Sequence, residues 1–419
     1  MNDLDLSKIK KVFFIGIGGI GISAIARMMF LEGKEVSGSD MSESQITQEL
    51  TKLGVKITIG QNFELIPKDT ELIIYTLAIP HYDKNLFELV VNSGIPHRSY
   101  PQTLGLVTAD KYTIAVSGTH GKTTTTAMIA KILIDAGKDP SVVVGSLLKE
   151  YKSNFIVGKS DLFVVEACEY ERSFLNLKPK ILVITNIEAE HLDYYKDLAD
   201  IQSAFKQLSA QSERVISDYS KFLEKVPKLS VPGAHNRMNA AATLAVAEIL
   251  NIKEEIAQKS LAEFTGTWRR LEKKGETKEG TIIYDDYAHH PTEIKASLEG
   301  LRELYPADSK KITVLFQPHL YSRTKALFND FVNCFDGADN VLLLPIYFAR
   351  EDPDPSVSSE KLADAIRMHR GEAVAFSNFK EAEEWVSKMK LGSKDVFVTM
   401  GAGEAYKVAD KVFKLTQFS

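Results

Sequence analysis

The chain has 419 residues, which is too long for one ordinary hydrophobic core and favours two or three domains. Its formal charge of −5 and the absence of a basic tract with interleaved aromatic residues argue against a nucleic-acid partner. The only two cysteines, Cys168 and Cys334, are too few for a disulfide framework or a paired metal-ligand motif, and they fit a reducing compartment. We therefore expect small-molecule partners.

The N-terminal residues do not resemble a targeting signal. The apolar run VFFI, which starts at Val12, meets glycines after a few residues, so it lacks the apolar region of a signal peptide. No segment contains 18 uninterrupted apolar residues. We expect a cytoplasmic protein without a membrane partner, and the sequence leaves monomer and homodimer both open.

Three successive segments alternate short apolar runs with helix-like stretches. The first contains VFFIGIG, EVSGSD, VKITIG and ELIIYT, the second YTIAVSGT, PSVVVG, LFVVEA and ILVITN, and the third TIIYDDYA, KITVLFQP, NVLLLPIY and KDVFVTMGAG. Short buried runs separated by helical lengths are typical of parallel sheets covered by helices. The sequence therefore predicts an α/β chain with boundaries near residues 107 and 270.

A glycine motif follows the first predicted strand. Gly16, Gly18, Gly19 and Gly21 form G-x-G-G-x-G before a helix, and Asp40 ends the next strand. Glycine lets the backbone approach a pyrophosphate, and an acidic residue at this separation can meet a ribose. A nicotinamide dehydrogenase, another nucleotide-binding protein and a tight turn without ligand all fit this motif.

A second glycine loop, SGTHGKTT, lies between the strand-like run YTIAVS and a helix. Its backbone N–H groups can hold phosphate, its lysine can neutralise the β- and γ-phosphate oxygens, and its threonine hydroxyl can bind Mg²⁺. The predicted ATP-phosphate residues are Gly118, Thr119, His120, Gly121, Lys122, Thr123 and Thr124. A dehydrogenase needs none of these groups, and a chance glycine turn is the remaining alternative.

Candidate metal ligands follow two further strands. Glu166 ends the run LFVVE, and His191 and Asp193 lie beyond ILVITN. Ligands in open α/β sheets gather outside the carboxyl ends of the strands, so we expect Thr123, Glu166 and His191 to converge on Mg²⁺ around a triphosphate. A hydrogen-bonded loop residue or a helix cap is the alternative for a lone histidine.

Six separated segments resemble those of the Mur ligases: SGTHGKTTT, EACEYERSFLNLKP, TNIEAEHLDYY, PGAHNRMNA, YDDYAHHPTE and FQPHLYSRT. The similarity runs to the terminal TMGAGEAY and is greatest to the branch that adds L-alanine. It implies a Rossmann-like UDP-sugar-binding domain (1–106), a central P-loop ATPase-type mononucleotide-binding domain (107–270) and a C-terminal Rossmann-like amino-acid-binding domain (271–419). The first glycine motif and Asp40 would then bind the UDP-sugar.

The resemblance implies a ligase of peptidoglycan precursor synthesis that uses ATP and Mg²⁺. The carboxylate of UDP-N-acetylmuramate would become an acyl phosphate, which the amino group of L-alanine attacks. Lys122 would stabilise the γ-phosphoryl group, Thr123 and Glu166 would hold one Mg²⁺, and His191 would help to hold a second. A recycling ligase that adds a tripeptide to the same sugar, and a noncatalytic nucleotide-binding module, are the alternatives.

The resemblance also assigns residues beyond the phosphate loop to the nucleotide. Asn236 and Asn239 lie three residues apart near a predicted helix start, where N-capping is the alternative. Arg270 is preferred to its neighbour Arg269 as the catalytic arginine that reaches ATP phosphate. Asp286 matches the acidic residue associated with the nucleotide.

Three residues are assigned by the resemblance to the incoming amino acid. His289 and His319 would lie near L-alanine, and Arg323 would pair with its carboxylate. His289 and His290 are adjacent and therefore lack the i, i+4 spacing of a zinc-binding helix.

The chain departs from the family pattern at two places. Leu320 stands where some relatives carry a second basic residue. The interval from His191 to His235 is only 44 residues, which predicts that a strand or hairpin of the central domain is absent. Lys206 lies where some relatives carry a carbamylated lysine that orients the metal, and a solvated lysine on an amphipathic helix is the alternative.

Overall fold

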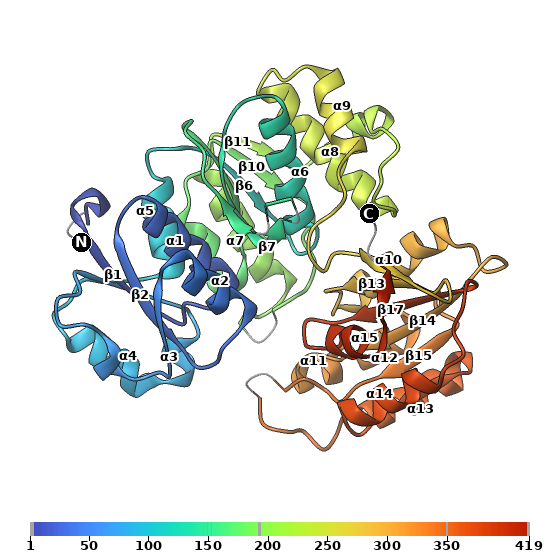
Figure 1. Cartoon of the computed structure of the whole chain (residues 1–419). Helices are drawn as coiled ribbons and strands as arrows, with labels where there is room; N and C mark the ends of the chain where they lie inside the picture. Colours follow the sequence, from blue (N-terminus) through green and yellow to red (C-terminus); the bar gives the residue numbers. More distant parts are fainter. Residues whose placement is uncertain (1–3, 149, 152, 192–193, 349–350, 417–419) are drawn as a thin grey trace. The chain divides into compact units, whose positions relative to one another are not determined.

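The computed structural model describes residues 4–148, 150–151, 153–191, 194–348 and 351–416, so Asp193 lies outside the described residues. The described strands form three sheets (Figure 1). The chain divides into two compact units, Met1–Lys228 with Met238–Phe264 and Leu229–Arg237 with Thr265–Ser419. The first unit contains the first two sheets and the second unit contains the third.

The first sheet has the order β3-β2-β1-β4-β5, and every pairing is parallel. Its strands are β1 (Lys11–Ile15), β2 (Glu35–Asp40), β3 (Lys56–Ile59), β4 (Leu72–Tyr75) and β5 (His97–Ser99). Its helices are α1 (Ile20–Leu31), α2 (Gln45–Leu53), α3 (Ile79–Tyr82), α4 (Lys84–Asn92) and α5 (Tyr100–Thr108), with the 3-10 turns η1 (Leu6–Lys8) and η2 (Phe63–Leu65). The strand order reverses beside β1, as in doubly wound sheets.

Burial on both faces explains why β1 is a continuous apolar run. Val12 and Phe14 belong to the core cluster that includes α1, whereas Phe13 and Ile15 belong to the cluster that includes α4. Successive side chains of a strand point to opposite faces, so helices on both sides require apolar residues at every position. The carboxyl end of β1 then leads into the first glycine motif.

The second sheet has the order β11-β10-β6-β9-β7-β8, with only β7 and β8 antiparallel. Its strands are β6 (Tyr112–Ser117), β7 (Ser141–Leu148), β8 (Ser153–Ile156), β9 (Leu162–Glu166), β10 (Ile181–Ile184) and β11 (Arg214–Ile216). The helices are α6 (Lys122–Asp135), α7 (Leu198–Ala210), α8 (Ala234–Ile249) and α9 (Glu254–Ala262), with η3 (Tyr170–Asn176) and η4 (Ser220–Lys225). Between β11 and α8, where every residue is described, only η4 forms, in agreement with a shortened central domain.

The third sheet has the order β16-β15-β14-β17-β13-β12-β18. Its strands are β12 (Glu272–Thr277), β13 (Ile282–Asp286), β14 (Lys311–Phe316), β15 (Asn340–Leu343), β16 (Ala373–Ala375), β17 (Asp395–Met400) and β18 (Leu415–Thr416). Its helices are α10 (Pro291–Leu304), α11 (Tyr321–Ala326), α12 (Phe328–Asn333), α13 (Ser359–Arg370), α14 (Phe379–Lys388) and α15 (Tyr406–Val412). The five strands β16, β15, β14, β17 and β13 are parallel, while β12 pairs antiparallel with β13 and β18.

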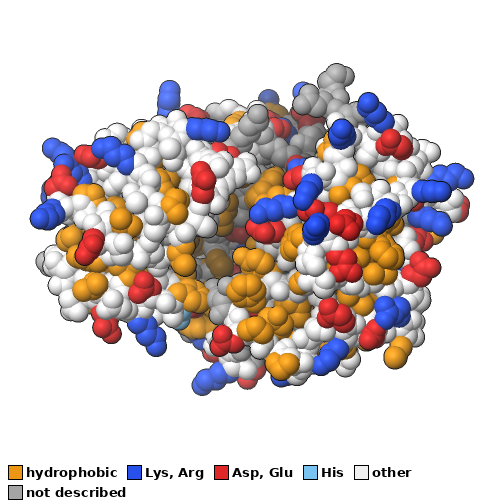
Figure 2. All heavy atoms as spheres, turned by 60° about the horizontal axis from the view of Figure 1, so that its bottom comes forward, with side chains coloured by type: hydrophobic (Ala, Val, Ile, Leu, Met, Phe, Trp, Pro, Cys, Tyr) orange, Lys and Arg blue, Asp and Glu red, His pale blue; other side chains and the backbone are white. Residues whose placement is uncertain are grey.

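The surface agrees with the small net charge of the sequence. On the face drawn in Figure 2, lysine and arginine side chains are interspersed with aspartate and glutamate side chains. Among the described residues, no helix combines the length and the apolar composition that crossing a membrane requires.

Candidate active site

The loop between β6 and α6 has the backbone of an anion-binding turn. Gly118 and Gly121 have φ values of +137° and +81°, which residues other than glycine rarely adopt. A Cβ atom at Gly118 would lie 2.0 Å from the Thr185 hydroxyl, and one at Gly121 would lie 2.5 Å from Oδ1 of Asn239. No side chain caps α6, so the N–H groups of its first turn are available to an anion.

The segment after β10 holds this loop in place by hydrogen bonds. Thr119 N–H donates to the Asn186 carbonyl oxygen (3.0 Å), and His120 N–H donates to Asn186 Oδ1 (2.8 Å). The Thr185 hydroxyl donates to the His120 carbonyl oxygen (2.5 Å), and Glu188 N–H donates to Thr119 Oγ1 (2.8 Å). Asn186 was not predicted as a site residue, although its position in TNIEAEH next to a strand end was the available signal.

Thr123 and Glu166 lie together as predicted for a shared Mg²⁺. The Thr123 hydroxyl donates to Glu166 Oε1 (3.0 Å), and Gly145 N–H donates to Glu166 Oε2 (2.7 Å). A Cβ atom at Gly145 would lie 2.7 Å from both carboxylate oxygens, so a side chain there would displace the Glu166 carboxylate. Thr124 is half-buried in the same turn of α6.

Lys122 is paired with Glu169, which was not predicted as a site residue. Its Nζ lies 2.9 Å from Oε1 of Glu169, and its side chain is 14% exposed. Burial alone would lower the pKa of Lys122, but Glu169 and the other acidic groups around it together outweigh burial and raise that pKa above its ordinary value. Glu169 was visible as a second carboxylate in EACEYER, three residues after Glu166.

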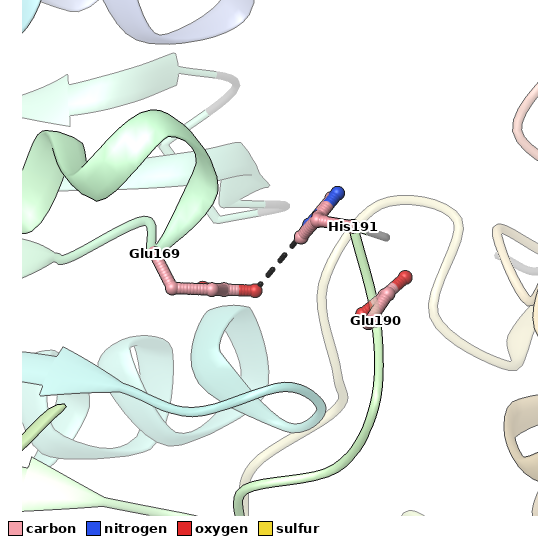
Figure 3. Close-up of side chains that lie close together, drawn as sticks. All are labelled: Glu169, Glu190 and His191. Atoms are coloured by element: carbon pink, nitrogen blue, oxygen red, sulfur yellow. Dashed lines mark ion pairs between the residues drawn. The ribbon is translucent and has the colours of Figure 1, made fainter. Parts of the chain in front are cut away.

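The side chain of His191 lies beside that of Glu169 (Figure 3). Its Nε2 lies 3.5 Å from Oε1 of Glu169. Burial would raise the pKa of Glu169, but Lys122 and His191 outweigh it and hold that pKa below its ordinary range. His191 has φ +56°, and its ring lies 4.9 Å from the ring of Tyr170. Such a backbone conformation is costly for a residue with a Cβ and recurs at functional sites.

The side chains around His191 fit a divalent cation. One ligand atom each of Glu169, Glu190 and His191 lies within 4.8 Å of the others. Glu169 Oε2 is buried and accepts no hydrogen bond, as expected of an oxygen reserved for a cation. The structure therefore forms two groups of candidate ligands, Thr123 with Glu166 and His191 with Glu169 and Glu190. This arrangement fits the two Mg²⁺ ions that the family resemblance implies.

The first glycine motif forms a tight turn closed by its acidic residue. Gly16 has φ +76°, and a Cβ there would lie 2.5 Å from the Thr76 side chain. Gly18 N–H donates to Asp40 Oδ2 (2.8 Å), so Asp40 shapes the loop as well as ending β2. Ribose binding by Asp40 stays a prediction.

The same motif leads into α1. Gly19 is the N-cap of α1, which has no side-chain cap. A Cβ at Gly21 would lie 2.7 Å from the ring of Tyr100, which belongs to α5. Glycine is thus required at Gly21 by helix packing, and binding of the UDP-sugar by Gly16, Gly18, Gly19 and Gly21 stays a prediction.

Asn236 and Asn239 are both buried near the start of α8. Asn236 Nδ2 donates to the Pro232 carbonyl oxygen (2.7 Å), and the side chain of Asn239 lies against Gly121 of the phosphate loop. Because α8 begins at Ala234, neither residue occupies the N-cap position. The contact of Asn239 with the loop supports its assignment to the nucleotide.

Adjacent arginines have different environments. Arg269 is buried, and its guanidinium donates to Asp285 Oδ2 (2.7 Å) and to the carbonyl oxygens of Gly403 (3.0 Å) and Gly401 (2.7 Å). The side chain of Arg270 is 29% exposed, with Nη1 3.8 Å from Glu293. Arg269 therefore has a structural role, which supports the choice of Arg270 as the phosphate-binding arginine.

Asp286 lies buried at the end of β13. Its Oδ2 accepts from the Ser297 hydroxyl (2.5 Å), and its Oδ1 accepts from Ala288 N–H (3.0 Å). Burial raises the pKa of Asp286 to about 6, although Ser297 and Arg270 oppose the shift. Asp286 can therefore change its protonation state near neutral pH.

His289, His319 and Arg323 are brought together as predicted. The rings of His289 and His319 lie 6.0 Å apart, and Arg323 Nη1 lies 3.3 Å from His319 Nδ1. Burial lowers the pKa of His289 to about 3, and burial together with Arg323 lowers that of His319 to about 4. His290 instead caps α10, accepting from Thr292 N–H through Nδ1 (3.3 Å).

Neither Lys206 nor Leu320 has surroundings that suggest a ligand. Lys206 is exposed on α7, whose buried residues are Ile201, Ala204, Phe205 and Leu208. This position favours the solvated lysine over a carbamylated metal ligand. Leu320 has φ +70° and precedes α11.

Family comparisons cover the chain in three parts. The descriptions "Mur ligase family, catalytic domain", "Mur ligase middle domain" and "Mur ligase, glutamate ligase domain" match residues 11–112, 116–217 and 269–403. Their order agrees with the three sheets and confirms the predicted three-domain α/β class.

Full-length relatives carry a more specific name. The UDP-N-acetylmuramate–L-alanine ligases of Agathobacter rectalis and Clostridium kluyveri are 38% and 39% identical, covering 99% and 97% of this chain and 100% and 98% of theirs. The solved UDP-N-acetylmuramate–alanine ligase of Thermotoga maritima superposes with a TM-score of 0.82 at 27% identity, covering 96% of this chain and 98% of its own. The chain therefore belongs to the Mur ligase family.

Proposed function

We propose that the protein joins L-alanine to the carboxylate of UDP-N-acetylmuramate, with conversion of ATP to ADP and phosphate, in peptidoglycan precursor synthesis. The observation that carries this proposal is the phosphate loop with its lysine and two groups of cation ligands at one edge of the second sheet. The full-length relatives named for this reaction support the choice of substrates.

The reaction must overcome the poor reactivity of a carboxylate. Its negative charge repels an amine, and oxide is a poor leaving group. Transfer of the γ-phosphoryl group of ATP makes an acyl phosphate, from which phosphate departs after the amine attacks. Mg²⁺, when bound, neutralises phosphate oxygens during this transfer.

The residues of the second sheet supply charge and position. The N–H groups of Thr119 and His120 donate to Asn186, so those at the start of α6 would bind the phosphate. Lys122 would bring a cation to the same place. Thr123 and Glu166 would hold one Mg²⁺, while His191 with Glu169 and Glu190 would hold a second. Buried, preorganised charges need little rearrangement as the reaction proceeds, which is their main advantage over water.

His289, His319 and Arg323, which follow strands of the third sheet, are suited to binding an amino acid. A guanidinium can only donate, so the contact of Arg323 with His319 Nδ1 leaves that nitrogen unprotonated. The low pKa values of His289 and His319 keep both rings uncharged near neutral pH. Arg323 is therefore the cation of this group, and it can pair with the carboxylate of L-alanine while neutral rings leave the amino group unrepelled.

Phosphate release with varied acceptors tests the proposal. The protein is given ATP, Mg²⁺ and UDP-N-acetylmuramate with L-alanine, glycine, L-serine or the L-alanyl-γ-D-glutamyl-meso-diaminopimelate tripeptide, and each product is weighed by mass spectrometry. We expect release to depend on L-alanine and the product to gain one alanyl residue. A response to the tripeptide alone would move the protein to the recycling branch, and release without any acceptor would contradict ligase activity.

We further propose that this enzyme works in the cytoplasm as a monomer or a homodimer. Its nucleotide substrates are cytoplasmic metabolites, and its cysteine usage fits a reducing compartment. Light scattering of the purified protein, with and without substrates, distinguishes the two oligomeric states, and a larger assembly would contradict both.

A further inference from the structure

The ammonium group of Lys122 has no proton left for a phosphate in this structure. Its Nζ donates to the carbonyl oxygens of Gly118 (2.5 Å) and Thr119 (3.0 Å) and to Glu169 Oε1 (2.9 Å). An ammonium has three donors, so these contacts use all of them. A phosphate can gain Lys122 only if one of these three bonds is given up.

Glu169 is the partner best placed to give way. Its side chain is 3% exposed, and its Oε2 accepts no hydrogen bond, so half of the carboxylate is buried without compensation. The two carbonyl oxygens belong to the loop that wraps the phosphate, whereas Glu169 reaches Lys122 from another element. A carboxylate and a phosphate beside the same ammonium also repel each other.

The backbone holds Glu169 in place while its partner changes. The Tyr195 hydroxyl donates to the Glu169 carbonyl oxygen (2.5 Å). Two residues farther on, Glu171 pairs with His81 (2.7 Å), and Arg172 pairs with Asp200 (2.6 Å). An exchange of partners therefore needs only a side-chain movement of Glu169.

We propose that Glu169 is an exchangeable counter-ion, which holds Lys122 until nucleotide phosphate takes the ammonium and then faces the divalent cation beside His191 and Glu190. This inference rests on the proposed function, because it requires that the loop binds a nucleotide. It makes Glu169 a positioning residue that couples nucleotide binding to the cation. Without a cation, nucleotide binding leaves the buried carboxylate with only its 3.5 Å contact to His191, and a bound cation replaces the lost charge of Lys122.

The dependence of ADP binding on Mg²⁺ tests this exchange. Calorimetry gives the Kd of ADP with Mg²⁺ and with EDTA for wild type and for Glu169→Gln, which keeps the size of the side chain and removes its charge. We expect the variant to bind ADP at least about tenfold more tightly than wild type in EDTA. With Mg²⁺ this gain should disappear. The ratio of the Kd in EDTA to the Kd in Mg²⁺ should therefore be lower in the variant than in wild type by the same factor.

Two further variants separate the exchange from a general disturbance. Glu171→Gln, on the same loop but paired with His81, should keep the wild-type ratio. In the Lys122→Met background, Glu169→Gln should lose its tightening effect in EDTA, because the competition for the ammonium is absent. A thermal melt of each variant reports folding.

The outcomes separate the two proposals. A wild-type protein that binds ADP, with Glu169→Gln weakening ADP binding equally in EDTA and in Mg²⁺, would overturn the exchange and leave the proposed function standing. A Glu169→Gln protein that does not fold would overturn the exchange as well, since Glu169 would then be structural. Failure of the folded wild type to bind ADP in either condition would overturn both proposals.

Discussion

Arg269 and Arg270 have the same side chain and adjacent positions, but only Arg269 is tied into the fold. Its guanidinium makes three hydrogen bonds to Asp285, Gly401 and Gly403. The guanidinium of Arg270 instead lies over the ring of Tyr287 and 3.8 Å from Glu293. The sequence could not show this difference, because it depends on which side chain the turn before β12 directs into the core.

Substitution of each arginine by methionine separates these roles. Arg269→Met leaves Asp285 buried without its cation, so we expect a loss of about 3–5 kcal/mol in the free energy of unfolding. Arg270→Met should keep the wild-type stability and lose at least about a hundredfold in kcat. Denaturant unfolding and steady-state kinetics on both variants check this, and equal losses of stability would contradict the assignment.

Asp286 gives the stability a specific pH dependence. Its pKa of about 6 in the folded chain exceeds its ordinary value of 3.8, so the folded state binds the proton more tightly than the unfolded state. Stability therefore falls as pH rises from about 4 to about 6 and is constant above that range. The expected size is on the order of 3 kcal/mol.

Unfolding of Asp286→Asn at several pH values measures this contribution. Relative to the variant, wild type should lose stability across that window, because only wild type carries the carboxyl group. Asp308→Asn, an exposed aspartate of the same unit, is the control and should follow wild type. If the difference between Asp286→Asn and wild type stays constant with pH, the raised pKa is wrong.

At the scale of elements, β7 positions the carboxylate of β9. Paired residues of β7 and β9 end at Val143, and the register with β8 shifts between Val143 and Leu148. This irregularity leaves Gly145 N–H available to Glu166, which also accepts from Thr123 of α6. Two elements thus hold the side chain that we assign to Mg²⁺.

Gly145→Ala tests this support. Its Cβ would lie 2.7 Å from both oxygens of Glu166, so the carboxylate must move. We expect the Mg²⁺ concentration for half-maximal activity to rise by about 10- to 100-fold, with little change in thermal stability. Gly392→Ala, where a Cβ has room, is the control. An unchanged Mg²⁺ dependence would show that Glu166 needs no such support.

Strands were predictable where burial dictates their composition. The runs at β13, β14, β15 and β17 were predicted because helices cover both faces and demand apolar residues. The edge strands β16 and β18, and β12 next to β18, were not predicted. β12 reads EKKGET, a polar sequence that becomes a strand through its pairing with β13, and such tertiary pairing has no local signal.

In the candidate site, too, contacts between residues far apart in the sequence could not be predicted. The glycines, Lys122 and Thr123 were predictable because phosphate binding requires those residue types in that order. The Lys122–Glu169 ion pair was not, because it joins residues 47 apart in the sequence through the bend after β9. His191 was predicted as a ligand, but its two carboxylate neighbours emerge only from the fold.

At the scale of the molecule, the assigned groups fall into the two compact units. The phosphate loop and the cation ligands belong to the first unit, and Arg270, Asp286, His289, His319 and Arg323 belong to the second. The alignment with the Agathobacter rectalis relative spans 464 positions against 419 residues here, so that relative contains segments that this chain lacks. We expect the proposed chemistry to need none of these segments, because the phosphate loop and both groups of candidate cation ligands are formed in this chain.

The central claim is that a carboxylate is activated by phosphoryl transfer before the amine attacks. The most direct test uses UDP-N-acetylmuramate labelled with ¹⁸O in its carboxylate, together with ATP, Mg²⁺ and L-alanine, and weighs the released phosphate. An acyl phosphate transfers one carboxylate oxygen to phosphate, so we predict one ¹⁸O atom in each phosphate released. Phosphate free of ¹⁸O, formed while the alanyl product accumulates, would contradict the account.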